Sequence, residues 1–237
     1  MKFFRDKLYE DITIPAPPKD DIGEAAEVKR LIANRTAEQE KSIADHDEVP
    51  FYAIKKYCDD NKMMFHKDEF KDIIYGATDT INYFKDKFDR KRPIEVDKTL
   101  DTSPSKTNKT PSYPSGHAAQ SRIVARYVAG KFPEHEANLI EAGNECGYGR
   151  VLAGFHYPSD YEAGNLLGEK MYKLMNKENY IKEMKTFKTF MESIIDIPRS
   201  TYAPGVFDGA DSKNPKIKSS VMAMIDKQVK EFEKEYP

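Results

Sequence analysis

Apolar side chains recur every three to four positions over most of the chain, and this spacing constrains the possible fold more than any other feature. It is clearest over residues 67–87, where one face of a helix would carry Phe70, Ile73, Ile74, Ile81 and Phe84. The same period is found over 22–47, 50–61, 116–129, 134–153, 159–176, 180–195 and 215–236. No run of alternating β-branched residues is long enough to indicate a sheet. The sequence therefore predicts an all-α, single-domain helical bundle.

Proline, serine and threonine mark the parts of the chain that we expect to lie outside the bundle. Residues 1–21 contain Pro15, Pro17 and Pro18 and are interpreted as an extended N-terminal arm rather than a packed element. Residues 22–195 form the predicted helical domain, and 196–237 a C-terminal loop and helix of unknown role. Within the domain, 94–113 is predicted to be a long loop, and long loops are often functional.

Charge and cysteine content restrict the classes of partner. Charged residues are 33% of the chain but nearly cancel to a net charge of -2, so no overall field attracts nucleic acid or an anionic membrane, and any anion site must be local. No apolar run approaches the ~20 residues of a membrane span, and the N-terminus lacks the apolar core of a secretory signal. Cys58 and Cys146 are compatible with one disulfide or with two buried thiols.

Two segments carry groups that suit an anion. In "KDKFDRKRP", Lys85 and Arg92 are seven residues apart, about two helical turns, so both cations would project from one helix face. In "PSGH", Ser115 is a good N-cap, Gly116 allows close approach to the backbone, and the free N–H groups of a helix starting near His117 would point at an anion. The alternatives are a solvated basic helix end and an ordinary helix cap.

A third segment, "GRVLAGFHYPSD", contributes Arg150, His156 and Asp160. Pro158 suits the first turn of a helix, and Asp160, four residues after His156, can accept from the imidazole Nδ1–H and leave Nε2 as a free lone pair. A nucleophilic histidine needs this preparation. The alternative is that Asp160 caps its helix beside a half-buried His156.

Together, the order Lys-x6-Arg-Pro, Pro-Ser-Gly-His and Arg-x5-His-x3-Asp resembles the signature of the type 2 phosphatidic acid phosphatase superfamily, which includes vanadium haloperoxidases. The chain is most similar to the class A bacterial non-specific acid phosphatases, over residues 14–190. One departure is Gly149, where that family usually has serine; we expect an altered fit of Arg150 there.

The resemblance implies a function and a role for each site residue. His156 attacks phosphorus to form a phosphohistidine, oriented by Asp160, and His117 protonates the leaving alcohol and then activates water. The phosphate oxygens are held by Lys85, Arg92, Ser115, Gly116 and Arg150. We expect acid-optimal hydrolysis of many phosphate monoesters, some phosphotransfer, no metal and no cofactor, with vanadate able to bind as a phosphate mimic.

The same resemblance implies a periplasmic or secreted location, although the chain shows no signal peptide, which leaves the cytoplasm open. It also suggests a homodimer, whereas the charge balance and the lack of a long apolar run lead us to expect no nucleic-acid partner and no membrane span. Two alternative functions are a vanadate-dependent haloperoxidase, which shares the pocket, and a phosphate-binding protein with little turnover, which Gly149 and the C-terminal extension would suit. The other histidines, His46, His66 and His135, are interpreted as surface or boundary residues.

Overall fold

The computed structural model describes residues 3–65, 67–195, 223, 226–227 and 229–230, and this part of the chain contains helices but no strand, as predicted. The first of its two compact units, Met1–Tyr172, holds every residue of the candidate site, and the second is Lys173–Pro237. The α-helices of the described residues are α1 (Asp21–Ala33), α2 (Ala37–His46), α3 (Tyr52–Asp60), α4 (Lys67–Phe88), α5 (Pro93–Val96), α6 (Gly116–Lys131), α7 (Glu136–Leu152) and α8 (Pro158–Ile195), with 3-10 turns η1 (Leu8–Asp11) and η2 (Pro133–His135).

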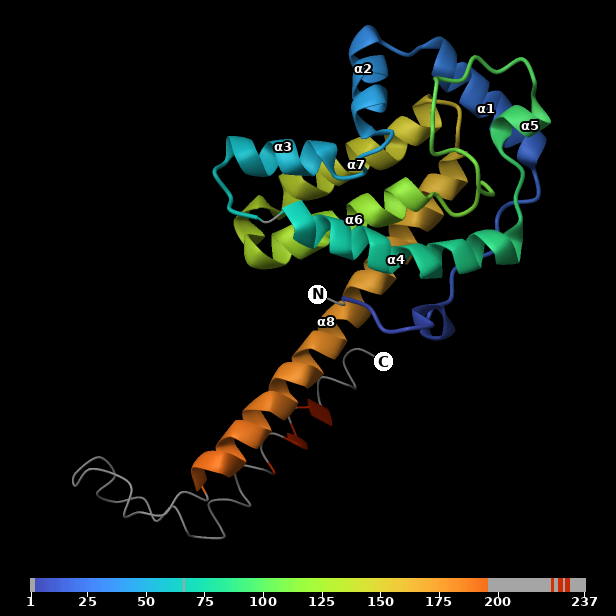
Figure 1. The fold of residues 1–237 in the computed structure, drawn as a ribbon. Coiled ribbons are helices and arrows are strands. Elements are labelled where there is room, and N and C mark those ends of the chain that lie inside the picture. Colours follow the sequence, from blue (N-terminus) through green and yellow to red (C-terminus); the bar gives the residue numbers. More distant parts are fainter. Residues whose placement is uncertain (1–2, 66, 196–222, 224–225, 228, 231–237) are drawn as a thin grey trace. The chain divides into compact units, whose positions relative to one another are not determined.

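Helix α6 forms the centre of the first unit. It packs along α7, with α4 beside it, while α2 and α3 lie on α7 (Figure 1). Small residues permit the close α6–α7 contact: a Cβ added at Gly147 of α7 would lie 3.0 Å from the Cβ of Ala118. Alanine and valine fill the buried faces of α6, chiefly Ala118, Ala119, Val124, Ala125 and Val128. This packing holds the N-terminus of α6 beside the C-terminal half of α7.

The structure changes two of the predicted helix boundaries. The predicted helix over 22–47 is two helices, because Thr36 starts a new one with a capping box: its hydroxyl accepts from Gln39 N–H, and the Gln39 side chain accepts from Thr36 N–H. The predicted segments 159–176 and 180–195 are one helix, α8. No proline or glycine stands between these segments to end the helix.

The N-terminal segment also differs from expectation. The sequence predicts an arm that does not pack over residues 1–21, but five apolar residues of this segment are buried: Phe3, Phe4, Leu8, Ile12 and Ile14. The Tyr113 hydroxyl donates to Pro15 O at 2.7 Å, which ties the segment to the long loop. Apolar burial therefore outweighs the extended tendency of its prolines. The predicted loop and helix over 196–237 fall almost wholly outside the described residues.

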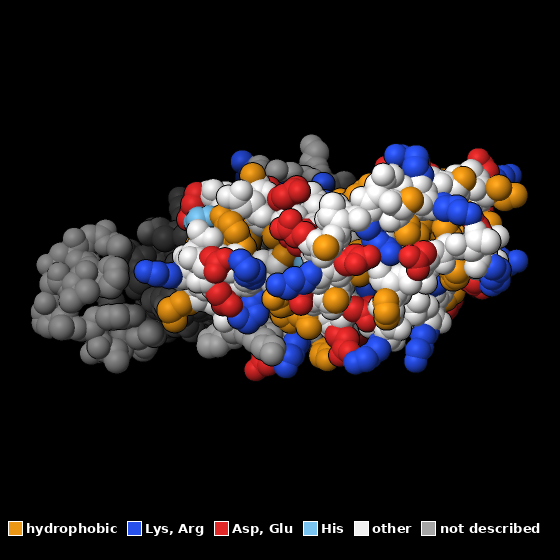
Figure 2. Space-filling view, turned by 90° about the horizontal axis from the view of Figure 1, so that it is seen from above, with side chains coloured by type: hydrophobic (Ala, Val, Ile, Leu, Met, Phe, Trp, Pro, Cys, Tyr) orange, Lys and Arg blue, Asp and Glu red, His pale blue; other side chains and the backbone are white. Residues whose placement is uncertain are grey.

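A long loop over 97–115 connects α5 to α6, close to the predicted 94–113 (Figure 1). Its backbone is attached at both ends to other parts of the unit: Ser103 N–H donates to Ala153 O at 3.0 Å, and Ser112 N–H to Arg90 O at 2.8 Å. Both cysteines are buried free thiols. Figure 2 shows lysine and arginine side chains interspersed with aspartate and glutamate, in line with the near-zero net charge. Within the described residues, none of the helices has the length and apolar character that crossing a bilayer requires.

Candidate active site

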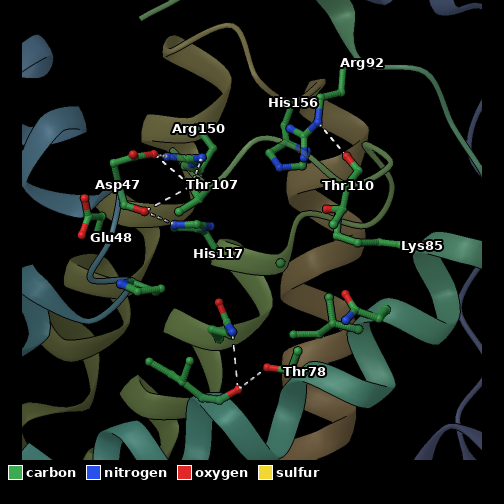
Figure 3. A pocket seen from close by; sticks show the side chains of 16 residues that line it. Asp47, Glu48, Thr78, Lys85, Arg92, Thr107, Thr110, His117, Arg150 and His156 are labelled. Carbon is green, nitrogen blue, oxygen red and sulfur yellow. Dashed lines mark hydrogen bonds and ion pairs between the residues drawn. The ribbon is translucent and has the colours of Figure 1, made fainter. Parts of the chain in front are cut away.

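A cavity of about 260 Å³ brings the three sequence motifs together (Figure 3). Its wall includes Lys85, Arg92, Gly116, His117, Arg150 and His156, and the buried side chains of Ser115 and Asp160 belong to the same cluster. In Figure 3, Arg150 and His117 lie on one side of the pocket, and Lys85, Arg92 and His156 on the other. Every predicted site residue is therefore part of one local arrangement.

Lys85 and Arg92 meet for a different reason from the one predicted. They do not share a helix face, because α4 ends at Phe88 and Arg92 is the N-cap of α5, with φ -76° and ψ 156°. Asp89 has a positive φ of 42° just after α4, and the chain turns there. The turn, rather than the helical repeat, brings the guanidinium of Arg92 towards the ammonium of Lys85.

Backbone carbonyls accept hydrogen bonds from both cations. Lys85 Nζ donates to Pro111 O, and Arg92 donates from Nε to Thr110 O and from Nη1 to Phe155 O, both at 2.8 Å. The carbonyls of Thr110 and Pro111 belong to the long loop, which thereby contributes to the site through its backbone.

Arg150 is held by a carboxylate. It is 1% exposed, its Nη1 donates to Asp47 Oδ1 at 2.7 Å, and its Nε is buried without a partner. Burial and nearby positive charge oppose the charged forms of these side chains: the pKa of Lys85 falls to about 7 and that of Arg92 to about 10. The cavity thus gathers three buried cations, which an anion would stabilise.

The start of α6 adds neutral donors. The Ser115 hydroxyl caps the helix by accepting from Ala118 N–H at 3.4 Å, and helix geometry leaves the first N–H groups, including that of Gly116, without an intrahelical acceptor. A Cβ at Gly116 would make only ordinary contacts with the protein, the nearest to Ile81 at 3.5 Å. The absence of that Cβ therefore leaves room on the cavity side beside Lys85.

His156 and Asp160 form the predicted pair. His156 Nδ1 lies 3.2 Å from Asp160 Oδ2. Since an ionised carboxylate only accepts, Nδ1 carries the hydrogen and Nε2 keeps its lone pair. Burial, and then the charges of Arg92 and Lys85, hold the pKa of His156 well below its usual value, which favours the neutral ring. A neutral imidazole with one oriented nitrogen can act as a nucleophile.

Two residues that support Asp160 were missed in the sequence. The Ser112 hydroxyl donates to Asp160 Oδ2 at 2.5 Å, and Arg90 Nη1 donates to Asp160 Oδ1 at 2.7 Å. Burial raises the pKa of Asp160, and Arg90, Ser112 and the Tyr157 N–H act in the opposite direction. The donors on its two oxygens favour the carboxylate form of Asp160 against the effect of burial. Arg90 stood in the first motif, but nothing local distinguished it from its basic neighbours.

His117 contacts another missed residue, Asp47, which follows α2. His117 Nε2 lies 2.9 Å from the backbone O of Asp47. Burial and the Arg150 charge lower the pKa of His117 to about 3. The residue before Asp47 is His46, which the sequence places at the surface or boundary but which is 2% exposed. Its Nδ1 lies 2.8 Å from Ser42 O, and its Nε2 accepts from Ala53 N–H at 3.2 Å. These bonds fix the connection between α2 and α3.

Among the described residues, no group of three or more His, Cys, Asp and Glu side chains is arranged to hold a metal ion.

Comparison with known proteins agrees with this geometry. Residues 73–177, which contain all three motifs, match the model of the PAP2 superfamily. The acid phosphatase of Zymomonas mobilis is 35% identical over 92 residues, 38% of this chain and 35% of that protein. Non-specific acid phosphatases of Salmonella typhi and Providencia stuartii are 42% and 36% identical, over 24% and 26% of this chain and 23% and 25% of their own lengths. The chain thus matches about a third or less of each relative, and within that part the resemblance to acid phosphatases of this superfamily is confirmed.

Proposed function

We propose that this chain hydrolyses phosphate monoesters through a phosphohistidine formed on His156 Nε2. The observation that carries this proposal is the buried His156–Asp160 pair, 3.2 Å apart, in the wall of a cavity with three buried cations. The acid phosphatase names of the partial relatives support the same activity.

In the first step, the Nε2 lone pair attacks phosphorus while the bond from phosphorus to the ester oxygen breaks. The leaving oxygen takes a proton from His117, and Asp160 stabilises the positive charge that develops on the His156 ring. The charge on the phosphoryl oxygens persists throughout, and Lys85, Arg92 and Arg150 balance it together with the N–H groups at the start of α6.

In the second step, His117 accepts a proton from a water molecule, whose oxygen attacks the phosphorus of the phosphohistidine. The P–N bond breaks, its electron pair returns to His156 Nε2, and inorganic phosphate is released. His117 then carries the proton that it donates in the next cycle. An alcohol can replace water in this step, which would transfer the phosphoryl group, and we include phosphotransfer in the proposal.

We further propose that no metal is required, because the three side-chain cations supply the positive charge that a metal would provide. An acid optimum follows from His117, which must be protonated for the first step although burial and Arg150 lower its pKa to about 3. A bound phosphate dianion opposes that effect. The cavity wall also includes apolar and amide side chains, among them Ile74, Asn82 and Gln120, which suits small monoesters of varied structure. A periplasmic or secreted location stays a prediction.

The test is hydrolysis of p-nitrophenyl phosphate from pH 4 to 8, with and without a chelator, by the wild-type chain and by His156→Ala. We expect chelator-resistant activity on the acid side of neutral that is absent from His156→Ala. His117→Asn should still form an acid-labile phosphoprotein from this good leaving group, detectable by rapid quench with labelled substrate.

Three outcomes would refute the proposal. An active His156→Ala protein would show that His156 is not the nucleophile. Vanadate-dependent halide oxidation without ester hydrolysis would identify a haloperoxidase. Tight phosphate binding without turnover in the wild-type chain would identify a phosphate-binding protein.

A further inference from the structure

Asp47 is held by more contacts than its position between two helices requires. Its Oδ1 accepts from the Ser105 hydroxyl at 2.5 Å, the Thr107 hydroxyl at 2.9 Å and Arg150 Nη1 at 2.7 Å. Its Oδ2 accepts from the backbone N–H of Lys106 at 2.9 Å. The carboxylate is therefore fixed from two directions, by α7 through Arg150 and by the long loop.

The backbone carbonyl of Asp47 faces the second catalytic histidine. It accepts from the Thr107 hydroxyl at 3.2 Å, and His117 Nε2 lies 2.9 Å from it. A carbonyl oxygen can only accept, so His117 Nε2 carries a hydrogen whether the ring is neutral or charged. The proton that His117 gains and loses is then the one on Nδ1.

We propose that Asp47 is a positioning residue for both halves of the site: its side chain orients Arg150, and its carbonyl orients His117 so that Nδ1 is the proton-transfer atom. This inference rests on the proposed phosphatase function. Thr107 contributes to the same positioning, because its hydroxyl lies 2.9 Å from Arg150 Nη2 and also contacts Asp47. Figure 3 shows the four residues Asp47, Thr107, His117 and Arg150 gathered on one side of the pocket.

A purely structural role would not affect proton transfer, and the charges around His117 make this difference measurable. The ring faces Asp47 from the α2–α3 connection, Arg150 from α7, Lys85 from α4 and His156 before α8. Of these, Asp47 raises the pKa of His117, whereas Arg150 and Lys85 lower it. Removing the Asp47 charge therefore lowers the pKa of His117, so the proton is lost at lower pH.

The first variant is Asp47→Asn, which keeps the size of the side chain and removes its charge. We expect kcat/KM to fall about 10- to 100-fold, the range for losing a hydrogen bond to a charged group, and the inhibition constant of inorganic phosphate to rise. We also expect the alkaline limb of the kcat profile to move to lower pH. Asp101→Asn, an exposed carboxylate earlier in the same loop, is the matched control and should behave as wild type.

The second pair of variants avoids a buried charge. Thr107 is exposed, so Thr107→Val should fold. It loses the hydroxyl that contacts Arg150 and Asp47, and we expect phosphate inhibition to weaken several-fold. Thr107→Ser keeps a hydroxyl and should recover most of the affinity. Thermal melting of each variant establishes that the chain is folded.

The inference would be overturned if Asp47→Asn and Thr107→Val had the phosphate inhibition constant and pH profile of wild type. A uniform loss of kcat, with both of these properties unchanged, would show a structural role only and would also overturn it. Failure of the proposed function is seen separately, as a wild-type chain that does not hydrolyse the ester.

Discussion

Replacing Arg90 with lysine tests whether this guanidinium keeps the Asp160 carboxylate ionised. Arg90 is 5% exposed and makes four polar contacts at once. Its partners are Asp160 Oδ1 at 2.7 Å, the Ser159 hydroxyl at 2.7 Å, Asp21 Oδ1 at 3.0 Å and Glu24 Oε2 at 3.3 Å. Its guanidinium carbon also lies 3.9 Å from the centre of the Tyr157 ring. A lysine ammonium keeps the charge but cannot reach all of these groups from one position.

The expected loss of stability follows from the contacts that lysine gives up. Each hydrogen bond to a charged group contributes about 1.5–3 kcal/mol, and complete removal of a partner from a buried ion pair costs about 3–5 kcal/mol. Because lysine retains part of the pairing, we expect Arg90→Lys to lower the free energy of unfolding by about 2–4 kcal/mol. Domains are typically stable by about 5–15 kcal/mol, so the variant should remain folded at 25 °C.

The activity of Arg90→Lys should depend on pH in a defined direction. Arg90 lowers the pKa of Asp160 against the effect of burial, so weakening the pair raises that pKa. A protonated Asp160 cannot stabilise the charge on His156. The acid limb of the kcat/KM profile should therefore move to higher pH, with the greatest loss of activity at low pH.

The measurements are urea denaturation at pH 7 and a kcat/KM profile from pH 4 to 8. The matched control is Arg126→Lys, since Arg126 also binds two carboxylates, but these are Glu136 and Glu169 rather than Asp160. It should leave the profile unchanged and cost about 1 kcal/mol or less, as for surface ion pairs. An Arg90→Lys chain with wild-type denaturation midpoint and acid limb would refute the reasoning.

Three further predictions concern packing, proton linkage and acid stability. Gly164→Ala should destabilise the fold by about 1–3 kcal/mol and reduce activity, because the new Cβ would lie 2.5 Å from Ser115 O; Gly149→Ala, whose Cβ meets only ordinary contacts, should be neutral or stabilising in the same melting and rate assays. Phosphate binding at pH 8, where inorganic phosphate is mainly the dianion, should take up protons, because the dianion raises the pKa values of Lys85 and His117, which are about 7 and about 3; calorimetry in two buffers measures this uptake, and His117→Asn should lower it. Hydrogen bonds from Ser105, Arg150, Lys106 and Thr107 outweigh the effect of burial and lower the pKa of Asp47. The ionised carboxylate therefore stabilises the fold above the unfolded pKa of about 3.9, and this stabilisation is lost as the pH falls below that value. Melting temperature should consequently fall less between pH 4 and 2 in Asp47→Asn than in wild type, and equal slopes would count against this.

The helices and the three motifs could be predicted because their signals are local. Apolar spacing reports the buried face of a helix, and the pairing of His156 with Asp160 follows from four residues of separation at a helix start. The boundary between α1 and α2 could also have been predicted, since Thr36 and Gln39 form the sequence pattern of a capping box. The packing of residues 1–21 could be predicted only in part, because the prolines there indicate an extended segment outside the core whereas the apolar residues indicate burial.

The supports of the catalytic groups could not be predicted because they depend on tertiary contacts. Arg90 becomes important only when α1 brings Asp21 and Glu24 next to it. Asp47 lies 103 positions before Arg150, in a segment without any motif. The approach of Lys85 to Arg92 also depended on a turn that the helical pattern over 67–87 does not reveal.

Under the proposed function, the carbonyls of Thr110 and Pro111, which accept from Arg92 and Lys85, bear on how quickly a turnover can end. A phosphate that bound cations lacking any other acceptor would leave them unsolvated on departure, and product release would be correspondingly slow. Here the departing anion is exchanged for acceptors that the loop already supplies. The same carbonyls would compete with an arriving substrate, so under the proposed function they would weaken substrate binding and speed the release of inorganic phosphate.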